Sequence, residues 1–240
     1  MTDNPSNLDT TNVTLTATNT VQEGGQITYT AKLTNPAGSA MTVSLSNGST
    51  ITIAKNATEG SVTVDAPRNT VYVDNTNVSA TITGTTGGDF ERVSVSPTAA
   101  VTSVTDTIDT STVTLTATPS VVEGGVITYT ATVSAPVTGS PLVVSLANGQ
   151  QITIAVNATT GSVNYTAPNN VYATNAPVTN SITGTSGGNY EKLDTAGTPS
   201  TTVTDNPNNL DTTNVTLTAT NTVQEGGQIT YTAKLSNPAG

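Results

Sequence analysis

The chain repeats itself at intervals of about 100 residues, and this repeat limits its architecture more than any other feature. A segment of the form [NT]VTLTAT occurs three times, with its first valine at Val13, Val113 and Val215. The motifs EGG, ITYTA and VTD recur at similar intervals. Such a period is too long for a solenoid repeat of about 20–50 residues and equals the size of one small domain. We therefore predict tandem domains at residues 1–105 and 106–204, followed by an N-terminal fragment of a third at 205–240. We expect the chain to be a piece of a longer array.

Each copy shows the two-residue alternation of β-strands. Apolar residues alternate with threonine in VTLTA and in ITYTAKL, and Asn47-Gly48 lies between two further alternating runs, which is a strong hairpin signal. We find no stretch of useful length with helical periodicity. About seven short strands in some 100 residues indicate an immunoglobulin-like sandwich. The prediction is an all-β fold of tandem immunoglobulin-like β-sandwich domains in an extended array, with Tyr29, Tyr129 and Tyr231 buried.

Composition excludes several classes of function. The chain has no histidine and no cysteine, so no Ser-His-Asp triad, catalytic cysteine or thiolate zinc site can form. Six basic residues at a net charge of −10 provide no footprint for nucleic acid. No apolar run of about 18 residues predicts a membrane span, so we expect no direct membrane insertion. We predict that the chain is not an enzyme, and paired carboxylates for glycoside hydrolysis are the less favoured alternative, because aromatic platforms for sugars are scarce.

Most of the 16 acidic residues lie at three recurring places, while the strands are nearly uncharged. These are the junctions (Asp3, Asp9, Asp106, Asp109, Asp205, Asp211), the EGG motif (Glu23, Glu123, Glu225) and the GG[DN][FY]E motif (Asp89, Glu91, Glu191). Acidic residues favour turns over strands in general. That preference does not explain why the same loops hold acids in each copy.

Strand direction predicts which of these acids meet. The first strand runs from the N-terminal to the C-terminal end of a domain, so the turn that holds Glu23 lies at the C-terminal end. The last strand also ends there and brings Asp106 to it. Glu91 joins them if residues 90–95 cross back, and otherwise faces the opposite end. Carboxylates that gather without Lys or Arg repel one another, and a hard cation relieves the repulsion. Oxygen ligands favour Ca²⁺ over Mg²⁺, which demands regular octahedral geometry.

The motifs together resemble the extender domains of giant RTX adhesins, large adhesion proteins of pseudomonads and related Gram-negative bacteria. EGG, SL[SA]NG, GG[DN][FY]E and VTD carry the resemblance, which covers essentially the whole chain. It implies an immunoglobulin-like sandwich, rigidity that depends on Ca²⁺, export by type I secretion and display at the outer membrane during biofilm formation. It also implies Ca²⁺ ligands at Glu23, Glu91 and Asp106 in the first copy, and at Glu123, Glu191 and Asp205 in the second. The complete set of candidate ligands is Glu23, Asp89, Glu91, Asp106, Asp109, Glu123, Asn189, Glu191, Asp205 and Asp211.

The function that we predict is that of a structural extender. It is a stalk segment of a secreted, extracellular cell-surface adhesin, tethered to the outer membrane within a larger protein. Ca²⁺ at the domain junctions rigidifies it, and it projects adhesive domains for attachment. Its partners are neighbouring repeats of the same chain, and we expect a monomer. The alternative is a ligand-binding adhesin module that captures a glycan or a protein.

Overall fold

A computed structural model describes residues 8–74, 76–208 and 210–239, and every regular element among them is a β-strand. Residues 1–7 of the first predicted domain, with Asp3, lie outside the described residues. The described chain holds no helix long and apolar enough to cross a bilayer. The chain divides into two compact units, Met1–Asp109 and Thr110–Gly240. The three predicted domains stay a prediction, although residues 106–109 group with the first unit and not with the second.

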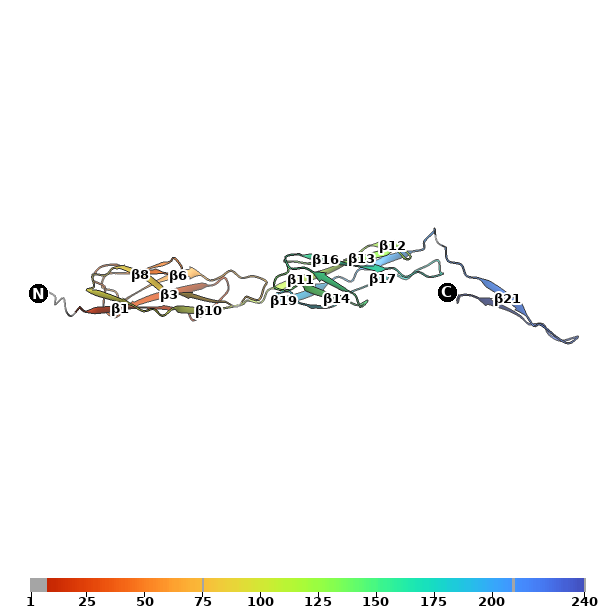
Figure 1. The fold of residues 1–240 in the computed structure, drawn as a ribbon, viewed down its shortest axis with the longest axis horizontal. Coiled ribbons are helices and arrows are strands. Elements are labelled where there is room, and N and C mark those ends of the chain that lie inside the picture. The colour runs from red at the N-terminus through yellow and green to blue at the C-terminus, as the bar shows by residue number, and fades with distance from the viewer. Residues whose placement is uncertain (1–7, 75, 209, 240) are drawn as a thin grey trace. The chain divides into compact units, whose positions relative to one another are not determined.

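The first unit is a sandwich of two layers (Figure 1). One layer has the strand order β6-β3-β1-β9. The other consists of β2-β10-β7 and β5-β4-β8, and it continues from one group to the next because only Thr81 separates β7 from β8. The strands are β1 (Thr10–Ala17), β2 (Thr20–Gln22), β3 (Gln26–Leu33), β4 (Met41–Leu45), β5 (Thr50–Ile53), β6 (Glu59–Asp65), β7 (Asn77–Ala80), β8 (Ile82–Gly87), β9 (Arg92–Val95) and β10 (Ala100–Thr105).

The second unit repeats this topology, with sheets β16-β13-β11-β19, β12-β20-β17 and β15-β14-β18. Its sandwich strands are β11 (Thr110–Ala117), β12 (Ser120–Val122), β13 (Val126–Val133), β14 (Leu142–Leu146), β15 (Gln151–Ile154), β16 (Thr160–Thr166), β17 (Val178–Thr179), β18 (Ile182–Ser186), β19 (Lys192–Ala196) and β20 (Ser200–Thr204). The predicted all-β fold of tandem immunoglobulin-like sandwiches is confirmed.

The alternation read from the sequence builds the core between the layers. Along β1 and β3 the apolar residues are buried and the intervening residues face outward, as a pleated strand with one covered face requires. Tyr29 and Tyr129 are fully buried, as predicted. The sequence analysis did not identify β2 and β9, which pair in parallel with β10 and β1. β2 and β9 are edge strands of their sheets, and their pairing fixes the loops next to them at the ends of the unit.

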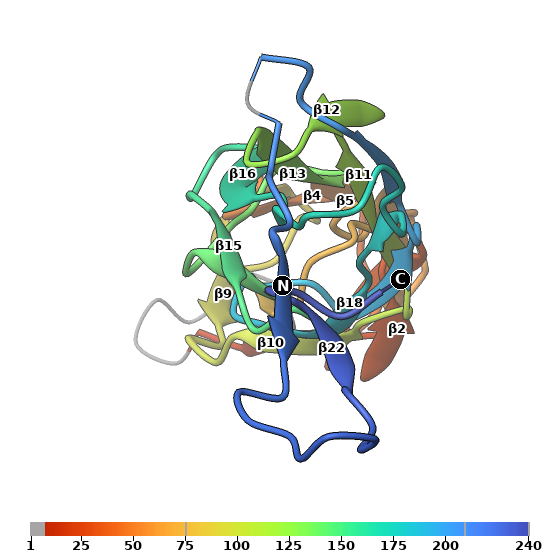
Figure 2. The ribbon, with the colours of Figure 1, turned by 90° about the vertical axis from the view of Figure 1, so that its right-hand side faces the viewer.

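The third copy contributes only the hairpin of β21 (Val215–Ala219) and β22 (Tyr231–Leu235), shown in dark blue in Figure 2. Every residue of both strands is exposed. Tyr231 is 67% exposed, so its predicted burial is wrong. The reason is that no second sheet covers the hairpin within the described part of the chain, and alternation buries a residue only where a facing layer exists.

Candidate metal centre

The EGG motif forms a tight turn that holds Glu23 against the end of the last strand. Gly25 N donates to Gln22 O at 3.0 Å, and Gly24 has a φ of 69°. This is the backbone of a type II turn, in which the third position needs a positive φ and favours glycine. Glu23 N in turn donates to Thr105 O at 3.0 Å, at the end of β10. The turn therefore lies where β10 ends, and Asp106 follows directly.

Three carboxylates meet at this end of the first unit. One oxygen each from Glu23, Asp74 and Asp106 lies within 4.8 Å of the others. Glu23 is only 8% exposed, and neither of its carboxylate oxygens has a hydrogen-bond partner. A buried carboxylate without a partner is costly, because the protein does not replace the water it has lost. The residues present fit a hard cation, because all three offer oxygen ligands at one point and Glu23 lacks any other partner.

Asp74 belongs to this cluster, and the sequence analysis did not find it. Strand β7 pairs antiparallel with β10, with Asn77 opposite Ser103, so the loop before β7 reaches the end of β10. Thr70 Oγ1 donates to Asp74 Oδ2 at 3.3 Å and fixes that loop. No recurring motif marks Asp74, because the second copy has VYATN where the first has VYVDN. Only the strand pairing of β7 could have indicated it.

The neighbouring acids change the protonation of Glu23. Contact with the carboxyl of Asp74, burial, and contact with Asp106 raise the pKa of Glu23 from 4.5 to about 7. A raised pKa means that the folded unit binds this proton more tightly than the unfolded chain does. A cation at the same oxygens would replace the proton.

Without calcium, we predict that the first unit loses stability as the pH rises from about 4.5 through about 7. The contribution of Glu23 is fully present below pH 4.5, where both folded and unfolded states are protonated, and is lost as the folded-state carboxyl ionises. The measurement is the melting temperature against pH in chelator for the wild type and Glu23→Gln. The variant should flatten the decline in this window, and parallel profiles for the two proteins would contradict the assignment.

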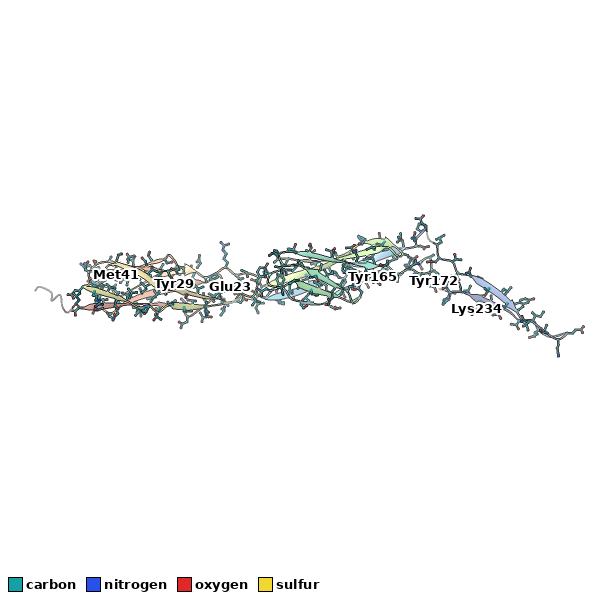
Figure 3. The ribbon with its side chains drawn as sticks, viewed as in Figure 1. Glu23, Tyr29, Met41, Tyr165, Tyr172 and Lys234 are labelled. Atoms are coloured by element: carbon teal, nitrogen blue, oxygen red, sulfur yellow. The ribbon has the colours of Figure 1, made fainter. Side chains whose placement is uncertain are left out.

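The acids of the GG[DN][FY]E motif lie at the opposite end of the unit. Met41 pairs with Gly87, and Figure 3 shows Met41 and Glu23 toward opposite ends with Tyr29 between them. Glu91 Oε2 accepts the N–H of Asp9 at 2.7 Å, just before β1 begins. The structure thus brings Glu23 and Asp106 together but keeps Glu91 away from them. A single site formed by Glu23, Glu91 and Asp106 is excluded in this fold, because β9 runs parallel to β1 and starts beside it.

An open hollow of about 510 Å³ occupies this N-terminal end of the first unit. Its lining includes Asp9, Asn35, Asp89, Phe90 and Glu91. Asp89 and Glu91 are exposed, and Asp89 has a left-handed backbone with a φ of 50°. Exposed acids remain hydrated, so unlike Glu23 they do not require a cation for stability.

The remaining candidates take the following places. Asp109 is half-buried, and its Oδ2 accepts the amide Nδ2–H of Asn69 at 2.6 Å.

In the second unit, Glu123 occupies the turn before β13 and is 4% exposed. Its N–H donates to Thr204 O at 2.9 Å, and the half-buried Asp205 follows directly. Asn189 and Glu191 lie in the loop between β18 and β19, and both are half-buried. Asp211 is exposed before β21. Among the described residues, Glu23, Asp74 and Asp106 form the one group of three acids close enough to share an ion.

Comparison with known proteins gives a family and a weak structural likeness. The LapA domain family matches residues 9–107, 109–206 and 211–240. The fibronectin(III)-like modules of CbhA from Clostridium thermocellum match with 16% identity over 80% of this chain and 94% of theirs, at a TM-score of 0.26. A search of curated proteins returned no match.

Proposed function

The chain belongs to the LapA domain family, and we propose that it is an extender segment of a cell-surface adhesin, stiffened by Ca²⁺ where one repeat leads into the next. Membership indicates an adhesin-related role at the cell surface or in the extracellular space, and adhesin domains of this type are not enzymes. The finer parts of the proposal are type I secretion, tethering at the outer membrane, a role in biofilm formation and a monomeric chain whose partners are its own neighbouring repeats.

The observation that carries the proposal is the position of the three carboxylates. Glu23 comes from the turn between β2 and β3, Asp74 from the loop before β7, and Asp106 from the segment that leaves β10. A cation bound by all three would join the exit of the chain to two loops of the first unit. It would supply positive charge and accept carboxylate oxygens as ligands.

A second contact also holds the exit segment against the first unit. Asn69 Nδ2 donates to Asp109 Oδ2 at 2.6 Å and holds one end of residues 106–109, and a cation shared by Asp106 with Glu23 and Asp74 would hold the other. Without a cation, the like charges of Glu23, Asp74 and Asp106 repel one another and weaken one of these attachments. The direction in which the chain leaves the unit would then vary. This dependence suits a stalk that folds and stiffens only in a calcium-rich exterior.

Ligand capture is the less supported function. The N-terminal hollow is open and lined by acids, with Phe90 as its aromatic residue. Ligand sites usually enclose most of their ligand and are lined mainly by apolar and aromatic side chains. This open, acidic hollow therefore supports the role of a spacer better than that of a ligand-binding module.

The proposal predicts that Ca²⁺ narrows the distribution of distances between the two units. The protein has no cysteine among its residues, so Ser61→Cys and Ser162→Cys, at exposed positions of β6 and β16, give a single pair of spin labels. Pulsed dipolar spectroscopy should find a narrow distance distribution in Ca²⁺ and a broad one in chelator. Glu23→Gln in the same labelled background should remain broad in Ca²⁺. An equally narrow distribution in both conditions would refute stiffening by calcium.

A further inference from the structure

The C-terminal ends of the two units differ in the hydrogen bonds of one loop. In the first unit, Tyr72 N donates to Thr70 Oγ1 at 3.2 Å, and in the second, Tyr172 N donates to Asn170 Oδ1 at 2.8 Å. Asn170 is therefore the counterpart of Thr70. Thr70 binds the Asp74 carboxylate, whereas the Asn170 amide Nδ2 donates to Asn175 Oδ1. The second loop is thus closed by a bond between two neutral amides.

The sequence has a neutral residue where the first unit has Asp74. Asp74 follows Tyr72 by two residues, and the same spacing from Tyr172 leads to Thr174. The second loop thus has a hydroxyl group in place of the carboxylate of Asp74.

The two buried glutamates consequently have different partners. Both oxygens of Glu23 lack a hydrogen-bond partner, and they lie among two other carboxylates. Glu123 Oε1 accepts the backbone N–H of Asn170 at 3.2 Å. Its Oε2 has no hydrogen-bond partner among the described residues.

From this difference, and building on the proposed function, we infer that Asp74 is a cation ligand that sets the calcium dependence of a repeat, so that the first unit needs Ca²⁺ at its C-terminal end and the second is held there by hydrogen bonds. The first unit offers three carboxylates, and the second offers Glu123 and Asp205. Ligand charge is a main determinant of affinity for Ca²⁺. In the second loop Thr174 supplies no charge, and the Asn175 amide oxygen already accepts the Asn170 amide.

A stalk built from both kinds of repeat would contain two kinds of joint. Joints that follow a unit with Asp74 stiffen only when calcium is present, whereas joints that follow a unit with Thr174 keep their hydrogen-bonded loops in either condition. Stiffness along the chain would then be set by one loop position per repeat.

Calcium binding by the full chain tests the inference, with isothermal titration of Ca²⁺ alone as the probe. Asp74→Asn should weaken the tightest site about tenfold or more, as loss of a charged ligand does. Thr174→Asp should add a site of comparable affinity in the second unit, and Glu123→Gln should then remove it. Asp65→Asn makes the same acid-to-amide change at an exposed strand end and should leave binding unchanged. Circular dichroism establishes that each variant is folded.

Several outcomes would overturn the inference. Wild-type affinity in folded Asp74→Asn would do so, as would equal losses of bound calcium in Glu23→Gln and Glu123→Gln. If Asp74→Asn fails to fold, the gain of a site in Thr174→Asp still decides the question. Failure of the proposed function looks different, because the chain would then bind calcium with the expected dependence on Asp74 while the distances between spin labels stayed unchanged.

Discussion

Removal of calcium should lower the melting temperature of the first unit by about 10 °C. A ligand that binds only the folded state adds about 2.7 kcal/mol at a concentration of 100 times its Kd. For a domain of about 100 residues, each kcal/mol corresponds to roughly 4 °C or more. Differential scanning calorimetry in saturating Ca²⁺ and in chelator measures the shift. Superimposable curves would show that the carboxylates of Glu23, Asp74 and Asp106 bind no calcium that matters for stability.

The variant Glu23→Gln makes this test sharper, because its effect should change sign with the solvent. In Ca²⁺ it should melt below the wild type, since a charged ligand is lost. In chelator near neutral pH it should melt at or above the wild type, because an amide removes the repulsion from Asp74 and Asp106 and can donate to them. Asp65→Asn, on the surface of the same unit, should follow the wild type in both solvents. A variant less stable than the wild type in both solvents would point to a packing role for Glu23 instead.

Gly87→Ala should destabilise the first unit by about 3 kcal/mol or more, because it combines a strained backbone with a clash. Gly87 ends β8 with a φ of 78°, in the left-handed region that favours glycine. A Cβ atom there would press against the carbonyl oxygen of Ala40, which is backbone and cannot turn aside. The expected fall in melting temperature is about 10 °C. Chemical denaturation with a constant m-value gives the free energy of unfolding directly.

Gly84→Ala is the matched control on the same strand. Nothing lies within 4 Å of the Cβ that it would add. Its effect should be small, at about 1 kcal/mol or less, and stabilising where the backbone suits alanine. The second unit offers the same pair, since Gly187 has a φ of 78° against the Pro141 carbonyl and Gly184 has open space. Equal stability of Gly84→Ala and Gly87→Ala would show that the end of β8 can shift away from β4 without cost.

This pair also explains why the GG[DN][FY]E motif recurs. We interpreted the motif through its acids, as part of a metal site. The structure shows that Gly87 and Gly88 both adopt a positive φ, at 78° and 91°, and the second copy does the same at Gly187 and Gly188. The recurrence therefore has a backbone cause that is independent of any ion. The acids Asp89 and Glu91 are exposed at the end of the unit opposite to Glu23.

The sequence by itself determined the repeat, the all-β sandwich and the alternation that buries Tyr29 and Tyr129. Each of these follows from local rules, because the strand period is two and a covered face must be apolar. Strand direction also determined that Glu23 and Asp106 lie at the same end of a unit. Glu23 and Asp106 each follow a strand, and the order of the strands along the chain fixes the direction of each strand. The prediction therefore required no knowledge of distant contacts.

Only the tertiary structure decided which other residues reach that end. Asp74 joins Glu23 because β7 pairs antiparallel with β10, and Glu91 stays away because β9 pairs parallel with β1. Such pairings join residues far apart in the sequence, and the alternation within a strand does not specify its neighbour. Tyr231 makes the same point, since it has the pattern of a core residue and is exposed where the described chain supplies no facing sheet. Burial and ligation both need a partner, and the partner is a property of the fold.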